Sequence, residues 1–195
     1  MKPTEHINLC LASHRRLLRN LASVTDDDVR SPSLLPGWSR GHVITHLANK
    51  TKTHIWLFGG PPVGEVRRQH PEGYQQEPDI EAGAHRSATE LRSDLMLSFE
   101  GLEAAWDALR DGLWDHKGIV TPGPRSMAEI VFRQVRDVET HHVDLDLGYH
   151  TSDWPRSYVE GELNKRLRAL PDRADHADLL AWLLGRSAAP ELSPW

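Results

Sequence analysis

The sequence predicts a mainly α-helical protein, a four-helix bundle with a short C-terminal appendage. Four long segments repeat their apolar residues at helical spacing, and only one long excursion interrupts them. A chain of 195 residues with 38% hydrophobic residues is long enough for one substantial core. We therefore expect the bundle over residues 1–150 and a short extension, or reduced second domain, over residues 151–195.

The first predicted helix spans residues 4–24, with Thr4 as its N-cap. Its apolar face carries Ile7, Leu11, Leu18 and Leu21. Cys10 and His14 lie on the same face. We expect both side chains to pack in the core, where such residues are common.

The second predicted helix spans residues 39–58 and begins at Ser39, after an acidic turn at residues 25–30 and two proline breaks. His42 and His46 lie along one side of it at i, i+4, a spacing that can chelate a metal. This helix therefore offers one or two candidate ligands.

A long loop is expected over residues 59–78, where glycines, prolines and polar residues are frequent. Its length, about 20 residues, is unusual in a compact domain and suggests a flap over a site. A long third helix is expected over residues 79–109, followed by an irregular stretch with a short extended piece at residues 119–120. The apolar face of the third helix carries Leu91, Leu95, Phe99, Leu102, Trp106 and Leu109.

The fourth predicted helix spans residues 126–148. Ser126 and Glu129 form a capping-box pattern at its start, and Gly148 suits the left-handed position after a helix end. One stripe of residues repeats at helical spacing and should face the core: Val131, Val135, Val138, His142 and Leu145.

Two carboxylate–imidazole pairs flank this stripe. Asp137 and His141 are spaced i, i+4, and Glu139 and His142 are spaced i, i+3. Catalytic zinc typically takes three His, Asp or Glu ligands and leaves one position open. Either pair could supply two of them, with a histidine of the second helix as the third; spacing alone leaves the choice of pair and of histidine open.

The chain after Gly148 changes character. Residues 149–155 form a linker, residues 156–170 a charged helix and residues 175–184 a short apolar helix. Residues 187–195 are rich in proline and are expected to be irregular.

Composition excludes several functional classes. The 28 acidic and 23 basic residues give a net charge of −5 without a long basic run, so nucleic acid is a poor partner. No apolar run approaches the ~20 residues that span a bilayer, and no signal pattern opens the chain, so we expect no membrane partner and a cytoplasmic location. Cys10 is the single cysteine, which excludes an internal disulfide.

Two motifs carry a family resemblance. Residues 34–48, LLPGWSRGHVITHLA, resemble the first motif of the DinB-like superfamily and, more narrowly, of the mycothiol-dependent maleylpyruvate isomerases. Residues 135–145, VRDVETHHVDL, resemble the second motif of that family. Leu184-Gly185-Arg186 resembles a third, shorter motif, in which the family has a functional arginine.

The resemblance implies a DinB-like metal-binding bundle whose ligands are His46, Asp137 and His141. His42 and His142 would then be neighbours of the site rather than ligands. The family has a glutamate where this chain has Asp137, which is shorter by one methylene group and must approach the metal more closely.

The resemblance further implies an enzyme with Zn²⁺, or another divalent metal, and mycothiol as thiol cosubstrate. The metal deprotonates the thiol, and the thiolate adds to the double bond of maleylpyruvate. Rotation about the resulting single bond and elimination of the thiolate give the trans isomer. Arg186 would bind a substrate carboxylate as a catalytic residue.

Two alternatives remain open at this stage. The same machinery could stop after addition, as a mycothiol S-transferase acting on an electrophile in detoxification or natural-product biosynthesis. The bundle could also bind a metal or ligand without turnover. In each case the expected partners are a small molecule and, for the enzymes, a low-molecular-weight thiol, with the chain as a monomer or homodimer.

Overall fold

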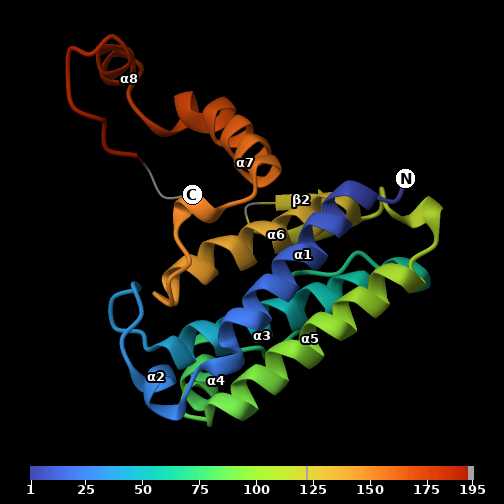
Figure 1. The fold of residues 1–195 in the computed structure, drawn as a ribbon. Coiled ribbons are helices and arrows are strands. Elements are labelled where there is room, and N and C mark those ends of the chain that lie inside the picture. Colours follow the sequence, from blue (N-terminus) through green and yellow to red (C-terminus); the bar gives the residue numbers. More distant parts are fainter. Residues whose placement is uncertain (122, 193–195) are drawn as a thin grey trace. The chain divides into compact units, whose positions relative to one another are not determined.

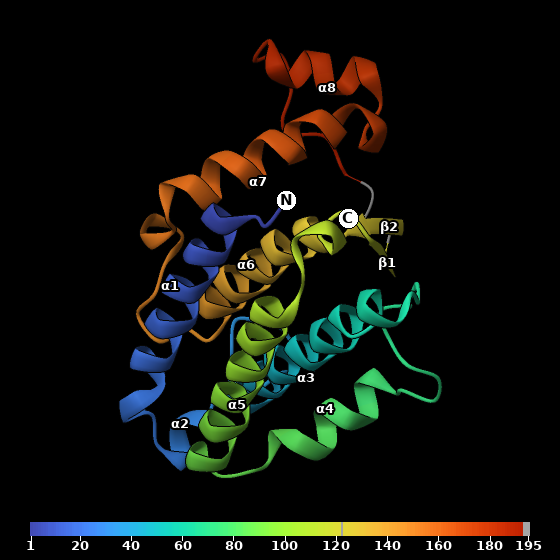
Figure 2. The ribbon, with the colours of Figure 1, turned by 90° about the vertical axis from the view of Figure 1, so that its right-hand side faces the viewer.

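The structure, a computed structural model, describes residues 1–121 and 123–192 and divides into two compact units, Met1–Asp153 and Trp154–Trp195. The first unit is a bundle of four long helices (Figures 1 and 2), which confirms the predicted fold class. These helices are α1 (Thr4–Asn20), α3 (Arg40–Phe58), α5 (Ala88–Ala108) and α6 (Met127–Asp144).

The bundle is built around α3 and α6. Helix α3 packs against α5 and α6, and α1 packs against α6 and α5. The apolar faces of these helices meet in one core cluster, which includes Leu17, Val43, Ile44, Leu47, Leu91, Leu95, Phe99, Val138 and Leu145. All five residues of the predicted stripe on α6 are buried, as the helical spacing indicated.

Shorter elements connect the long helices. In the first unit they are η1 (Leu21–Ser23), α2 (Asp26–Arg30), η2 (Pro61–Val63), α4 (Gln76–Ala84), η3 (Asp111–Leu113), β1 (Lys117–Val120), β2 (Gly123–Ser126) and η4 (Thr151–Asp153). The second unit contains α7 (Arg156–Ala169), η5 (Leu170–Arg173) and α8 (His176–Leu183). No helix among the described residues is long and apolar enough to cross a membrane.

The helix starts at Ser39 and Ser126 are confirmed. Each serine caps its helix in a capping box, with His42 as the partner in α3 and Glu129 in α6. Thr4, in contrast, is the first helical residue of α1 and not its cap, because the cap position is taken by Pro3.

The predicted single helix over residues 79–109 was wrong, because the chain forms two helices there. Helix α4 ends at Ala84, and α5 starts after a new capping box in which Ser87 Oγ accepts from the backbone N–H of Glu90 (3.3 Å). The Glu90 carboxylate in turn accepts from the backbone N–H of Ser87 (2.9 Å). This cap starts a new helix shortly before Leu91, the first residue of the predicted apolar face.

The end of α6 and the strand before it also differ from expectation. Helix α6 ends at Asp144, and Asp146 as well as Gly148 adopts a positive φ (52° and 79°). Arg40 binds the carbonyls just beyond this end, since its Nε donates to that of Leu145 (2.6 Å) and its Nη2 to that of Asp146 (3.0 Å). The extended piece expected at residues 119–120 is part of an antiparallel hairpin of β1 and β2.

The second unit contains the two helices that the sequence predicts after the linker. Helices α7 and α8 fall within the expected ranges 156–170 and 175–184. Asp175 caps α8, since its carboxylate accepts from the backbone N–H of Ala177 (2.8 Å). Part of the irregular C-terminal stretch, residues 193–195, lies outside the described residues.

Candidate metal centre

Polar side chains from two helices meet along the contact between α3 and α6. On α3 they recur every four residues, so they share one face of the helix. We define the α3–α6 seam by six residues, which are His46, Lys50 and His54 from α3 and Gln134, Asp137 and His141 from α6.

The first layer of the seam brings the two predicted histidine ligands together. The rings of His46 and His141 are 4.8 Å apart, centroid to centroid, and nearly perpendicular. His141 Nδ1 donates to Asp144 (2.8 Å), which leaves the lone pair of its Nε2 available. Burial, followed by the charge of His141, lowers the pKa of His46 to about 4, so His46 is neutral at pH 7.

The middle layer holds the predicted carboxylate. Asp137 Oδ1 accepts from Nε (3.2 Å) and Nη2 (2.9 Å) of Arg136, whereas the buried Oδ2 has no hydrogen-bond partner. Burial alone would raise the pKa of Asp137, but Arg136 and Lys50 outweigh it and lower the pKa to about 2. An ionised, buried oxygen without a hydrogen-bond partner, on the same seam as the neutral imidazole of His46, fits a divalent cation.

The three predicted ligands lie on the same seam, but their ligand atoms are not all close to one another. Within the described residues, the ligand atoms of His46, Asp137 and His141 do not all lie within 4.8 Å of one another. Asp137 is one methylene group shorter than a glutamate, and its carboxylate is also held by Arg136. The residue types of this donor set suit a divalent metal, but their ligand atoms are not gathered in this structure.

The third layer contains two residues that sequence reasoning missed. His54 Nδ1 donates to Gln134 Oε1 (2.6 Å), and Gln134 Nε2 donates to Thr51 Oγ1 (2.9 Å). His54 Nε2 is buried without a hydrogen-bond partner, and burial is the main reason that the pKa of His54 falls to about 4. The spacing of His54, two turns after His46, was the signal that could have identified it.

A second group of possible ligands lies next to the seam. The ligand atoms of His42, Glu81 and His85 lie within 4.8 Å of one another, the one such group of His, Cys, Asp or Glu in the described part of the chain. However, His42 Nδ1 accepts from the backbone N–H of Ser39 (3.1 Å), so the ring proton is on Nε2, which donates to Glu81 (3.1 Å). While His42 caps α3, its Nε2 therefore offers no lone pair to a metal.

Sequence reasoning did not single out Glu81 and His85. Their i, i+4 spacing was a usable signal, and His85 Nε2 does contact Glu81 (2.9 Å). Both side chains are exposed, with relative accessibilities of 67% and 70%, so this group is open to solvent.

The alternative pair on α6 faces α1 instead. Glu139 is fully buried, and its two carboxylate oxygens accept hydrogen bonds from Ser13, Arg16 (2.5 Å) and Tyr149 (2.5 Å). The ring of His142 stacks on Tyr149 at 3.8 Å. Since both oxygens of Glu139 are engaged by protein donors, this pair is poorly suited to hold a cation.

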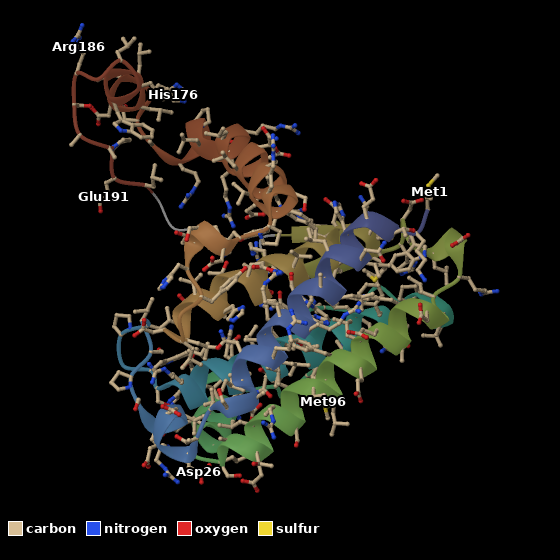
Figure 3. The ribbon with its side chains drawn as sticks, in the orientation of Figure 1. Met1, Asp26, Met96, His176, Arg186 and Glu191 are labelled. Carbon is tan, nitrogen blue, oxygen red and sulfur yellow. The ribbon has the colours of Figure 1, made fainter. Side chains whose placement is uncertain are left out.

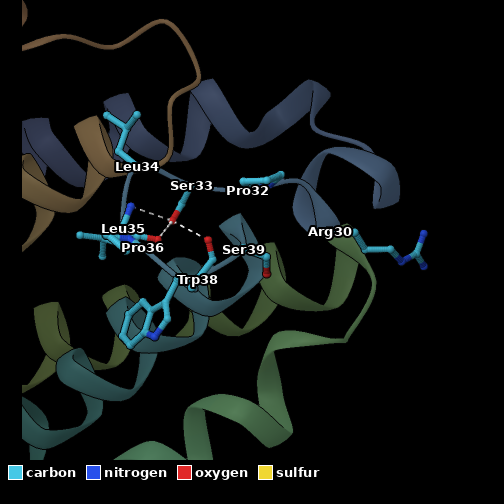
Figure 4. A pocket seen from close by; sticks show the side chains of 9 residues that line it. Arg30, Pro32, Ser33, Leu34, Leu35, Pro36, Trp38 and Ser39 are labelled. Carbon is cyan, nitrogen blue, oxygen red and sulfur yellow. Dashed lines mark hydrogen bonds between the residues drawn. The ribbon is translucent and has the colours of Figure 1, made fainter.

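A hollow of about 390 Å³ lies at the segment that precedes α3, and Figure 4 shows the side chains that line it. It is lined by Arg30 and by the segment from Pro32 to Ser39, within which Ser33 Oγ donates to the carbonyl of Trp38 (2.8 Å). The indole of Trp38 contacts His46 at a centroid distance of 5.4 Å. The segment around Trp38 thus forms both a ligand-sized hollow and one wall of the seam.

Cys10 is a core residue, as the sequence predicts. It is completely buried, and its Sγ lies 3.4 Å from Nε2 of His14, which is also buried. Burial, with a smaller contribution from Glu103, raises the pKa of the thiol well above its usual value. Cys10 is therefore protonated at neutral pH and a poor nucleophile.

Arg186 belongs to the second unit and is exposed just beyond α8 (labelled in Figure 3). Gly185 adopts φ 68°, and the backbone N–H of Arg186 donates to the carbonyl of Ala181 (2.8 Å). These features form a Schellman motif, so Leu184-Gly185-Arg186 has a local role in ending α8. Its proposed role in binding substrate stays a prediction.

Comparison with known proteins places these features in context. Residues 10–146 match the family model described as the mycothiol maleylpyruvate isomerase N-terminal domain. The fold is similar to a crystal structure of the mycothiol-dependent maleylpyruvate isomerase, with 24% identity, a TM-score of 0.77, and coverage of 82% of this chain and 67% of that one. A histidine-to-alanine mutant of that isomerase gives 23% identity and the same TM-score and coverage. A comparison with curated proteins gives no match.

Proposed function

The chain belongs to the family of the mycothiol maleylpyruvate isomerase N-terminal domain, and on that premise we propose that its α3–α6 seam is a metal-assisted site for thiol addition. The favoured reaction is a maleylpyruvate-like cis–trans isomerisation that uses an external thiol of the mycothiol type. The buried, ionised Oδ2 of Asp137, without a partner beside two imidazoles, is the observation that carries this proposal.

Three side chains would hold the metal, namely His46, Asp137 and His141. When bound, a divalent cation supplies positive charge that favours the thiolate over the thiol. Asp144 orients the ring of His141 by accepting from its Nδ1, a contact that positions metal-bound histidines. Burial of His46 contributes by keeping its ring neutral and its lone pair free.

The thiol would come from outside the chain. Cys10 is completely buried and carries a raised pKa, so it does not compete as the nucleophile. The hollow lined by Trp38 gives a bulky thiol room, and the indole of Trp38, an apolar wall of that hollow, also contacts the ring of His46. Isomerisation requires that the thiolate leave again, so the thiol is regenerated in each cycle.

Metal content tests the ligand assignment. Protein purified without chelators should contain about one zinc per chain, and His46→Ala or His141→Ala should weaken zinc binding by more than about 100-fold. His42→Ala is the matched control, because it removes a neighbouring histidine of α3 that caps the helix. Loss of zinc in His42→Ala and Glu81→Gln, with retention in His141→Ala, would place the metal at the exposed group instead.

Product analysis tests the reaction. Incubation with maleylpyruvate and mycothiol should give fumarylpyruvate while the thiol concentration stays constant, and His141→Ala should lose this activity. A stable thioether formed with loss of free thiol would identify a thiol S-transferase. Zinc binding without turnover of either kind would leave a ligand-binding bundle and refute the isomerase proposal.

A further inference from the structure

Lys50 occupies the centre of the seam. It lies one turn after His46 and one turn before His54 on α3. Both neighbours contact α6, His46 through the ring of His141 and His54 through Gln134. Lys50 is therefore held over the part of α6 that carries Asp137, and the two groups interact electrostatically.

Within the part of the chain that the structure describes, the ammonium group of Lys50 has no hydrogen-bond or ion-pair partner. Among the described residues, no carboxylate lies within 4.0 Å of its Nζ, and no hydrogen bond joins it to another group. The side chain is partly buried, and burial lowers its pKa from the usual value. Leaving a half-buried cation unpaired is unfavourable, and such groups normally have a partner or a ligand.

The surrounding charges make the middle of the seam positive. The charges of Arg133 and Arg136 lower the pKa of Lys50, whereas the charge of Asp137 raises it. The Oδ1 atom of Asp137 is already held by Arg136. A bound divalent metal would add further positive charge, so an anionic group of a ligand would be stabilised beside Lys50.

We propose that Lys50 binds a carboxylate of the substrate directly and thereby orients the acid along the α3–α6 seam. This inference rests on the proposed function for the identity of the site. It goes beyond the proposed function by assigning Lys50 as a binding residue and by requiring a negative charge on the group that Lys50 binds. Lys50 lies within the bundle itself, on the same helix as His46. A carboxylate bound there would hold the acid next to the reacting thiolate.

Two substitutions and one control test the assignment. Lys50→Met removes the charge and keeps the length of the side chain, and Lys50→Arg keeps the charge. Lys52→Met is the control, because Lys52 lies two positions along α3, is exposed, and pairs with Asp94 (2.6 Å) rather than facing the seam. Thermal unfolding of each variant reports whether the fold is retained.

Calorimetric titration with maleate, in the absence of thiol, measures the binding directly. The natural chain and Lys52→Met should bind maleate equally, Lys50→Met should bind at least about tenfold more weakly, and Lys50→Arg should recover most of the affinity. Maleamide, the uncharged diamide, should bind poorly to all four proteins. Equal maleate affinity in Lys50→Met and the natural chain, or no binding by the natural chain, overturns the proposal.

Zinc content, measured on the same samples, separates this inference from the proposed function. A chain without zinc whose maleate binding still depends on Lys50 contradicts the metal-assisted mechanism and supports the role of Lys50. A zinc-bound chain whose maleate affinity is unchanged in Lys50→Met contradicts only the role of Lys50. In turnover assays, Lys50→Met should raise KM more than it lowers kcat.

Discussion

The two sides of α6 each carry a carboxylate and an imidazole, but the two carboxylates differ in how many protein donors bind them. On the side that faces α1, Glu139 is saturated by donors from Ser13, Arg16 and Tyr149. On the side that faces α3, Asp137 keeps a buried oxygen without a partner. Both sides present a carboxylate and an imidazole from one helix, so the difference arises from the helix opposite.

This contrast between the two carboxylates separates a structural polar cluster from a candidate functional one. The carboxylate oxygens of Glu139 are occupied by protein donors, whereas Oδ2 of Asp137 is free to accept a ligand. The α1 side therefore stabilises the fold, whereas the α3 side provides the candidate site. The following substitutions test this division.

The largest effect should come from the α1 side. Glu139→Gln leaves the cation of Arg16 without its buried partner, and we expect a loss of about 3–5 kcal/mol in the free energy of unfolding. Urea denaturation measures this, and the folded fraction should keep its zinc. Asp137→Asn is the matched variant on the other side and should lose zinc. If Glu139→Gln lost its zinc but kept the stability of the natural chain, the metal site would lie on the α1 side of α6 and not on the α3 side.

Acid stability should depend on His142, which is buried and stacked on Tyr149. Burial, and then Arg16, lower the pKa of His142 to about 4, so the unfolded chain binds a proton more readily between pH 6.5 and 4. Stability from this group is complete above pH 6.5 and falls by up to about 3 kcal/mol as the pH drops to 4. His142→Phe should flatten the curve of unfolding free energy against pH between pH 6.5 and 4. An unchanged curve would contradict the lowered pKa of His142.

A longer carboxylate should improve the α3 side. Asp137→Glu adds the methylene group that separates this chain from the family pattern, and it should bring the ligand atoms closer together. We expect about tenfold tighter zinc binding, or ~1.4 kcal/mol, in competition with a chelator. Weaker binding in Asp137→Glu would show that the shorter side chain is suited to this seam.

The smallest effect should come from the cysteine on α1. Cys10→Ala removes a buried sulfur atom and should lower the free energy of unfolding by about 1 kcal/mol. Turnover with an external thiol should stay within about twofold of the natural chain, because Cys10 is buried and protonated. Loss of turnover in a folded Cys10→Ala protein would indicate that Cys10, and not an external thiol, is the nucleophile.

Much of the fold could be predicted because its signals are local. The capping boxes at Ser39 and Ser126 and the apolar stripe of α6 lie within a few residues of the elements they define. Errors arose where a distant or competing contact decided the outcome. Arg40, from another helix, binds the backbone carbonyls just beyond the end of α6, and the cap at Ser87 starts a new helix within a segment predicted as one.

For the site, the sequence alone determined which side chains could act, and the family resemblance selected His46, Asp137 and His141 among them. Only the tertiary structure decided which helix each pair faces, that Glu139 is engaged by protein donors, and that Lys50 has no partner among the described residues. The physical reason is that spacing along a helix fixes which side chains are neighbours on its surface. Whether their hydrogen bonds and charges are satisfied depends on residues more than a hundred positions away, such as Ser13 and Arg16.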